Sequence, residues 1–107
     1  MRKELHTPWS DEITLLRFRP DRDEQGYVLP QQPGSRSVFC TFEDGVSQNE
    51  FYLSEKMGMR ANASVELWAV DYDGEEYCCF GGRFYRVIRA FQSSFDAKTL
   101  ILSEVIR

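Results

Sequence analysis

The residues best suited to hold a metal ion fall in one short acidic segment. Asp71, Asp73 and Glu75 are spaced as at the start of a calcium-binding loop. An EF-hand loop also needs a glycine at its sixth position, a bidentate glutamate at its twelfth, and a helix on each side. The segment lies instead between two runs that alternate between apolar and polar residues. We therefore expect a turn between strands and no ion site.

Three cysteines could bind zinc together with His6, the only histidine of the chain: Cys40, Cys78 and Cys79. Structural zinc sites usually contain C-x-x-C or H-x-x-x-H spacings, and neither occurs here. Cys78 and Cys79 are neighbours on an expected strand, so their side chains point to opposite faces and cannot join without severe distortion. We expect buried free thiols, no metal and no cofactor.

Catalytic residues are not marked by any pattern in the chain. It contains no glycine-rich phosphate loop, nucleophile elbow or metalloprotease motif, and no spacing singles out a pair of carboxylates. Arg83, Arg86 and Arg89 are close in sequence and could pair with an acidic partner, or could be ordinary exposed strand residues. We expect no enzyme; an active site in the mouth of a barrel is an alternative that no group of residues supports.

Composition limits the class of protein. The 107 residues are 42% hydrophobic and 14% aromatic, which predicts one folded domain over residues 1–107. A formal net charge of −4 disfavours a nucleic-acid-binding protein, which usually has a basic surface. No apolar run approaches the roughly 18 residues of a membrane span, and the charged start lacks a signal peptide's apolar region. These features predict an intracellular domain that does not contact a membrane.

Residues 64–91 predict three antiparallel strands. Asp73-Gly74 and Gly81-Gly82 each separate two apolar runs, and such pairs suit the positive φ angles of two-residue hairpin turns. Further strands are expected at residues 12–18, 27–29, 36–43 and 99–106, and residues 1–9 are expected to be a flexible lead. The pattern predicts a mainly β fold, a small antiparallel barrel of about six strands.

One short helix is expected near residues 48–57. Ser47 and Glu50 fit a capping box, and Gly58 suits the left-handed position after a helix. A helix of this length is marginal alone, so its apolar residues, Phe51, Tyr52 and Met57, must pack on something. Phe51 and Tyr52 could form an interface with a partner, or could close one end of the barrel.

The order of these features resembles the head-tail adaptor, or head-closure, proteins of tailed bacteriophages and prophages. The resemblance spans roughly residues 9–105 and rests on a series of short segments, none specific alone: residues 9–12 (WSDE), 23–26 (DEQG), 36–40 (RSVFC), 47–52 (SQNEFY), Gly58, 71–75 (DYDGE) and 82–89 (GRFYRVIR). The chain departs from the family pattern at residues 59–61, where Met-Arg-Ala replaces a Leu-Lys-Pro-like triplet, and in its more apolar closing strand.

The resemblance implies a structural role in the virion, at the interface between head and tail, after assembly in the host cytoplasm. It implies a homo-oligomeric ring, dodecameric in the particle, that contacts portal or adaptor proteins on one side and tail proteins on the other. DNA would pass through the channel without being specifically bound. Possible interface residues are Phe51, Tyr52, Met57, Arg86 and Arg89. The alternative is a small SH3- or OB-like barrel that binds a peptide or nucleic acid.

Overall fold

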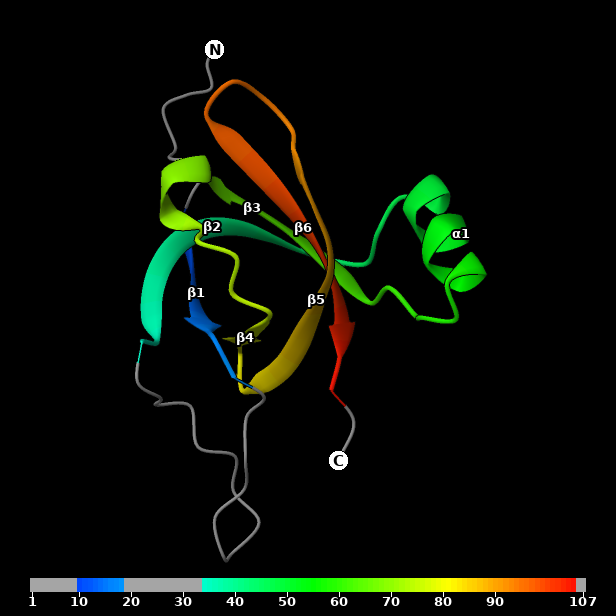
Figure 1. Ribbon diagram of the computed structural model, residues 1–107, viewed down its shortest axis with the longest axis horizontal. Coiled ribbons are helices and arrows are strands. Elements are labelled where there is room, and N and C mark those ends of the chain that lie inside the picture. Colours follow the sequence, from blue (N-terminus) through cyan, green and yellow to red (C-terminus); the bar gives the residue numbers. More distant parts are fainter. Residues whose placement is uncertain (1–9, 19–33, 106–107) are drawn as a thin grey trace, which may run out of the picture.

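The computed structural model describes residues 10–18 and 34–105. In chain order the elements are β1 (Asp11–Leu16), β2 (Arg36–Asp44), α1 (Gln48–Lys56), β3 (Ala63–Trp68), the 3₁₀ turn η2 (Ala69–Asp71), β4 (Tyr77–Phe80), β5 (Arg83–Gln92) and β6 (Ala97–Glu104). The six strands pair antiparallel in the order β1-β2-β3-β6-β5-β4, and β4 pairs back to β1 to close the barrel (Figure 1). The predicted fold class is confirmed.

Alternation along the strands fills the barrel. Every second residue of β3 points inward, and Val65 and Leu67 are fully or almost fully buried. The same period places Cys40 of β2 in the core, with Val38 and Phe42 packed against it, while Phe39 points outward. The buried cluster is Ile13, Leu15, Cys40, Ala63, Val65, Leu67, Cys78, Tyr85, Leu100 and Leu102.

The predicted hairpin at Asp73-Gly74 is wrong. β3 pairs with β2 and β6, whereas β4 pairs with β1 and β5, so this turn does not join two paired strands. A type I′ turn needs positive φ at both central residues, and only Gly74, at φ 80°, has it. β3 ends at Trp68. The chain then turns through η2 and enters β4, whose first residue, Tyr77, pairs with Leu16 at the end of β1. The positive φ angle expected at Gly74 is confirmed, but a local preference for a turn does not determine which strands pair.

The second predicted hairpin, at Gly81-Gly82, is confirmed. Phe80 and Arg83 are directly paired on β4 and β5, with the two glycines between them. Their φ angles are 59° and 80°, as a type I′ turn requires.

Replacing Gly81 by valine should lower the free energy of unfolding by roughly 1–3 kcal/mol, because a β-branched residue is strained at positive φ. A Cβ at this position meets no atom within 4 Å, so steric clash does not contribute. Gly81→Asn is the matched control, since asparagine tolerates this conformation. Urea unfolding measures both variants, and an equal loss of stability in the two would contradict the assignment of the turn.

The other element boundaries differ from expectation by about two residues. The first strand is Asp11–Leu16 in place of residues 12–18, and the last is Ala97–Glu104 in place of 99–106. The expected strand at residues 27–29 and the lead at residues 1–9 lie outside the described residues. None of the helices found in the described ranges has the length and apolar character that crossing a membrane requires.

Candidate interaction surface

Helix α1 is defined by local capping at both ends. The Ser47 hydroxyl accepts a hydrogen bond from the Glu50 backbone N–H at 3.2 Å. At the other end the N–H groups of Gly58 and Met59 donate to the carbonyls of Glu55 and Ser54, at 3.0 and 2.9 Å. With Gly58 at φ 75°, this is a Schellman motif. The helix predicted near residues 48–57 is confirmed, and Met57 is its C-cap.

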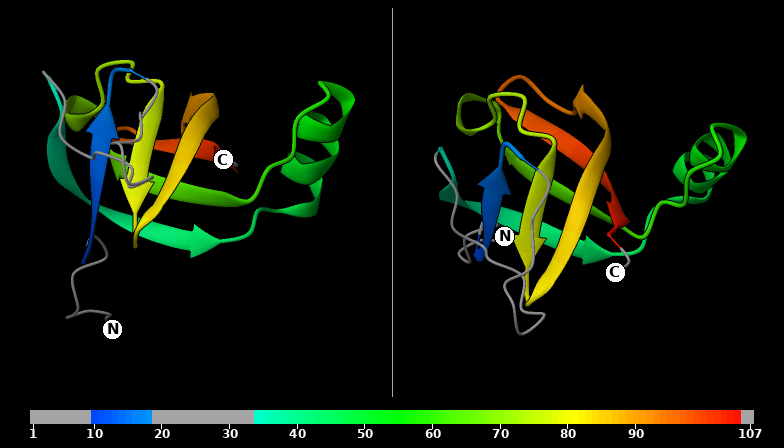
Figure 2. Two further views of the ribbon diagram at one scale, coloured as in Figure 1. Left: turned by 90° about the horizontal axis from the view of Figure 1, so that it is seen from below. Right: turned by 60° about the horizontal axis from the view of Figure 1, so that its bottom comes forward.

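The same helix contributes almost nothing to the barrel core. α1 projects from the end of β2 and β3, away from the barrel wall (Figures 1 and 2). Ser54 is the one residue of α1 that is buried. Phe51, Tyr52 and Met57 are 39%, 67% and 59% exposed. Neither aromatic belongs to the buried cluster of the barrel, and the alternative in which they close its end is tested by the double substitution described in the Discussion.

One ion pair ties α1 to the barrel. Nε and Nη2 of Arg89 on β5 donate to the two carboxylate oxygens of Glu50, at 3.0 and 3.2 Å. The guanidinium also lies 4.8 Å from the ring centroid of Phe91. Arg89 therefore positions the helix and is not available to an acidic partner in this arrangement.

The three arginines predicted as a group have different surroundings. Arg83 lines a pocket at the mouth of the barrel, and Arg89 holds α1. Arg86 is exposed on β5, where the backbone register places it opposite Tyr77 and Ser103. Within the described part of the chain it has no ion pair. Arg83 is likewise exposed and without an ion pair among the described residues, so Arg83 and Arg86 are the two that could meet an acidic partner.

A second exposed apolar surface lies at the opposite end of the barrel from α1. Val70 in η2 is 90% exposed and Phe95 in the turn after β5 is 95% exposed. A hydrogen bond of 2.8 Å from the Ala69 N–H to the Asp96 carbonyl holds the two segments together. The sequence signal for this position is an aromatic residue, Phe95, in an otherwise polar turn.

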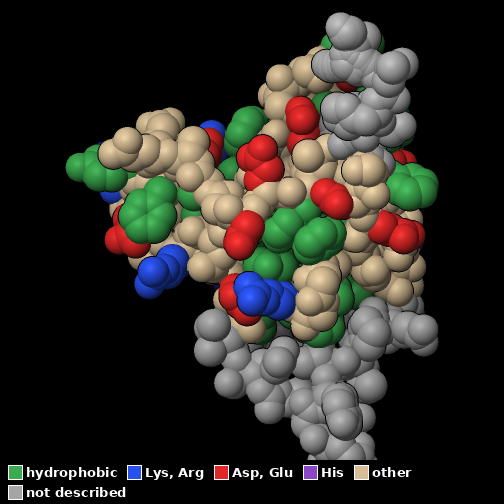
Figure 3. All heavy atoms as spheres, turned by 180° about the vertical axis from the view of Figure 1, so that it is seen from behind, with side chains coloured by type: hydrophobic (Ala, Val, Ile, Leu, Met, Phe, Trp, Pro, Cys, Tyr) green, Lys and Arg blue, Asp and Glu red, His purple; other side chains and the backbone are tan. Residues whose placement is uncertain are grey.

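The space-filling view from behind shows hydrophobic and acidic side chains on one face of the molecule (Figure 3). α1 carries hydrophobic side chains at the left of Figure 3, and acidic side chains are spread over the barrel face beside it. Hydrophobic side chains also gather at the centre of this face, between the acidic ones (Figure 3).

The acidic segment at residues 71–75 builds a polar network around the buried Glu75. Glu75 accepts hydrogen bonds from Arg36 Nε at 3.0 Å and from the Asp73 backbone N–H at 2.9 Å. The Tyr72 hydroxyl donates to the Glu75 carbonyl at 2.7 Å, and Arg17 pairs with Asp73 at 2.6 Å. Two carboxylates that a calcium ion would need are therefore bound to arginines, and the segment has a structural role.

The electrostatics of this network favour charged carboxylates. Burial by itself raises the pKa of the Glu75 carboxyl, but the backbone N–H groups of Asp73 and Glu75 and the Arg36 guanidinium outweigh it, so the pKa is lowered. The hydrogen bond from Arg17 likewise lowers the pKa of Asp73.

The cysteines are free, and Cys40 and Cys78 are buried in the core as predicted, while Cys79 is half-buried. Burial, with the charges of Asp11 and Glu12, raises the pKa of Cys40 to about 12. Burial also raises the pKa of Cys78 and of Cys79. The thiols are therefore protonated at neutral pH and poor nucleophiles. Among residues 10–18 and 34–105 no three His, Cys, Asp or Glu side chains are grouped to hold a metal ion; His6 lies outside these ranges.

Comparison with known proteins adds no relative: no protein-family model matches the chain, and no curated protein matches it.

Proposed function

We propose that this chain is a structural connector of a tailed phage or prophage particle, which closes the DNA-filled head and joins it to the tail. Two kinds of support converge on this function. The ordered series of segments over residues 9–105 resembles head-tail adaptor proteins, and the fold is a small barrel with one projecting helix.

The projecting helix is the observation that carries the proposal. A nine-residue helix is marginal in water, and α1 gains little from its own barrel. Its exposed Phe51, Tyr52 and Met57 gain free energy only when another surface covers them. Val70 and Phe95 are exposed at the opposite end, where a second partner would bind in a connector.

The proposed partners are the portal or adaptor ring on the head side and tail proteins on the other. Many copies are held together on a ring, so a contact that is weak between free subunits becomes strong through a high effective concentration. The net charge of −4 suits a subunit near a DNA channel, because like-charged walls repel the phosphate backbone and let it slide.

Particles assembled without the chain test the proposal. We expect filled heads that lose DNA and do not bind tails, and we expect purified protein to restore joined particles in electron micrographs. Genes for portal, capsid and tail proteins should lie beside the gene for this chain. Normal particles without the protein, or a metabolic gene neighbourhood, would contradict the connector function.

A further inference from the structure

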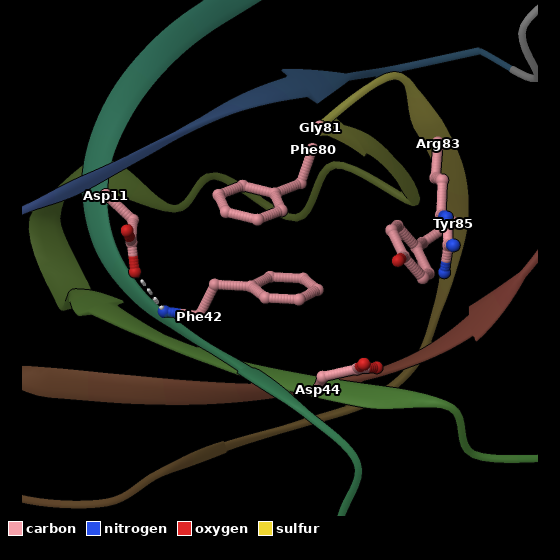
Figure 4. A pocket seen from close by; sticks show the side chains of 7 residues that line it. All are labelled: Asp11, Phe42, Asp44, Phe80, Gly81, Arg83 and Tyr85. Atoms are coloured by element: carbon pink, nitrogen blue, oxygen red, sulfur yellow. Dashed lines mark hydrogen bonds between the residues drawn. The ribbon is translucent and has the colours of Figure 1, made fainter.

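A pocket of about 460 Å³ opens at the end of the barrel from which α1 leaves (Figure 4). It is lined by Asp11 at the start of β1, by the last part of β2 and by the β4–β5 hairpin. The lining residues are Asp11, Phe42, Asp44, Phe80, Gly81, Arg83 and Tyr85. A volume of this size accommodates one large side chain together with the backbone that carries it.

Aromatic rings form the apolar part of the pocket. Phe42 and Phe80 are stacked, with ring centroids 3.9 Å apart and planes 10° from parallel. Tyr85 is tilted against Phe42 at 5.8 Å, and in Figure 4 its ring turns toward the stacked pair from the far wall. Both rings are partly buried and their facing surfaces cover each other, so the surface left for a group that enters the mouth is an outer face or an edge of the stack.

The charged groups around the rings are mainly acidic. Asp11 is held in place because its Oδ2 accepts the Phe42 backbone N–H at 3.0 Å, and it forms no ion pair with another described residue. Asp44 is exposed and forms no ion pair with any other described residue. Arg83 is the one basic residue of the lining, and its side chain interacts with the Tyr85 hydroxyl.

We propose that this pocket binds an arginine side chain presented by a segment of a partner protein. A guanidinium stacks on aromatic faces and pairs with carboxylates in its plane, and the mouth supplies both kinds of group. An anionic ligand, such as a nucleic-acid phosphate, would be repelled by Asp11 and Asp44. Binding of arginine at this pocket depends on the geometry of the barrel mouth alone and does not depend on the connector function.

Blocked tripeptides of the form Gly-X-Gly test the site by NMR titration of the labelled protein. With X as arginine we expect saturable shifts at Phe42, Phe80, Tyr85 and Asp44, with a dissociation constant in the millimolar range. With X as citrulline, the neutral isostere of arginine, we expect no saturable shift. Equal binding of the two peptides, or shifts that map outside the mouth, would overturn the proposal.

A pair of variants distinguishes a specific contact with the Asp44 carboxylate from general electrostatic attraction. Asp44→Asn should weaken binding of the arginine peptide about two- to fivefold, because one partly exposed ion pair is lost. Glu43→Gln removes the same charge from the adjacent residue of β2, which does not line the pocket, and should leave binding unchanged. Both positions are exposed, and the amide spectrum of each variant reports whether the fold is intact. Equal effects of the two substitutions would reduce the site to general electrostatic attraction and refute it.

Discussion

Replacing Glu75 by glutamine should lower the free energy of unfolding by about 2–4 kcal/mol, although the two side chains have nearly the same shape. Glu75 is buried and accepts hydrogen bonds from Arg36 and from the Asp73 backbone N–H. A glutamine can keep one of these acceptors, but its amide N–H₂ group then faces another donor. The variant also leaves Arg36 without its buried counter-charge.

The neighbouring residue provides the matched control. Glu76 is exposed, and within residues 10–18 and 34–105 it has no ion pair, so Glu76→Gln should change the free energy of unfolding by less than about 0.5 kcal/mol. Urea unfolding of both variants at neutral pH gives the comparison. A loss at Glu75 no larger than the loss at Glu76 would show that the buried network does not stabilise the barrel.

The contribution of Glu75 should also depend on pH. Its pKa is lower in the folded protein than in the unfolded chain, so folding favours the ionised form. The stability that it adds is therefore present above its ordinary pKa of 4.5 and is lost as the pH falls through the lower, folded-state value. The gap in stability between the natural protein and Glu75→Gln should narrow over that range. A constant gap down to acid unfolding would contradict this linkage.

Features that depend on near neighbours in sequence were predictable. The cap at Ser47, the left-handed Gly58 and the Gly81-Gly82 turn each follow from a few residues and their backbone preferences. Alternation likewise predicted strands where β2 and β3 lie, because a strand reverses side-chain direction at every residue. Together these signals were sufficient for the barrel class and for one helix.

Features that depend on distant pairing were not predictable from the same signals. Nothing in residues 64–80 shows that β3 pairs with β6 and β4 with β1, so the segment read as a meander. Arg36 lies thirty-nine residues from Glu75, which is why the acidic segment looked like a solvent-exposed turn. The arginine pair of Glu50 is equally distant in sequence. The sequence left open whether α1 packs on the barrel or projects from it. A short helix has the same pattern of apolar residues whether those residues pack on its own core or on a partner.

A double substitution, Phe51→Ser with Tyr52→Ser, should abolish joining of heads to tails and leave the barrel folded. Tyr52 is 67% exposed but Phe51 is 39% exposed, so their loss removes part of a covered aromatic surface, and the free energy of unfolding should fall by roughly 1–2 kcal/mol without unfolding the barrel. Two aromatic residues at the centre of a docking surface typically contribute 2 kcal/mol or more each. We therefore expect docking to weaken about thirtyfold for each aromatic residue and roughly a thousandfold for the pair, measured as joined particles per filled head in electron micrographs.

The matched control places serine on the polar positions of the same helix. Gln48→Ser with Glu55→Ser lowers helix propensity more than the aromatic variant does, because glutamine and glutamate are better helix formers than phenylalanine and tyrosine, but it removes no aromatic surface, so joining should be retained. Circular dichroism and urea unfolding confirm that both variants keep the barrel. If the aromatic variant unfolds, its side chains stabilise the barrel, and if it joins heads to tails as well as the control does, α1 is not the docking element. Loss of joining in both variants would assign the effect to helix stability instead of the aromatic surface.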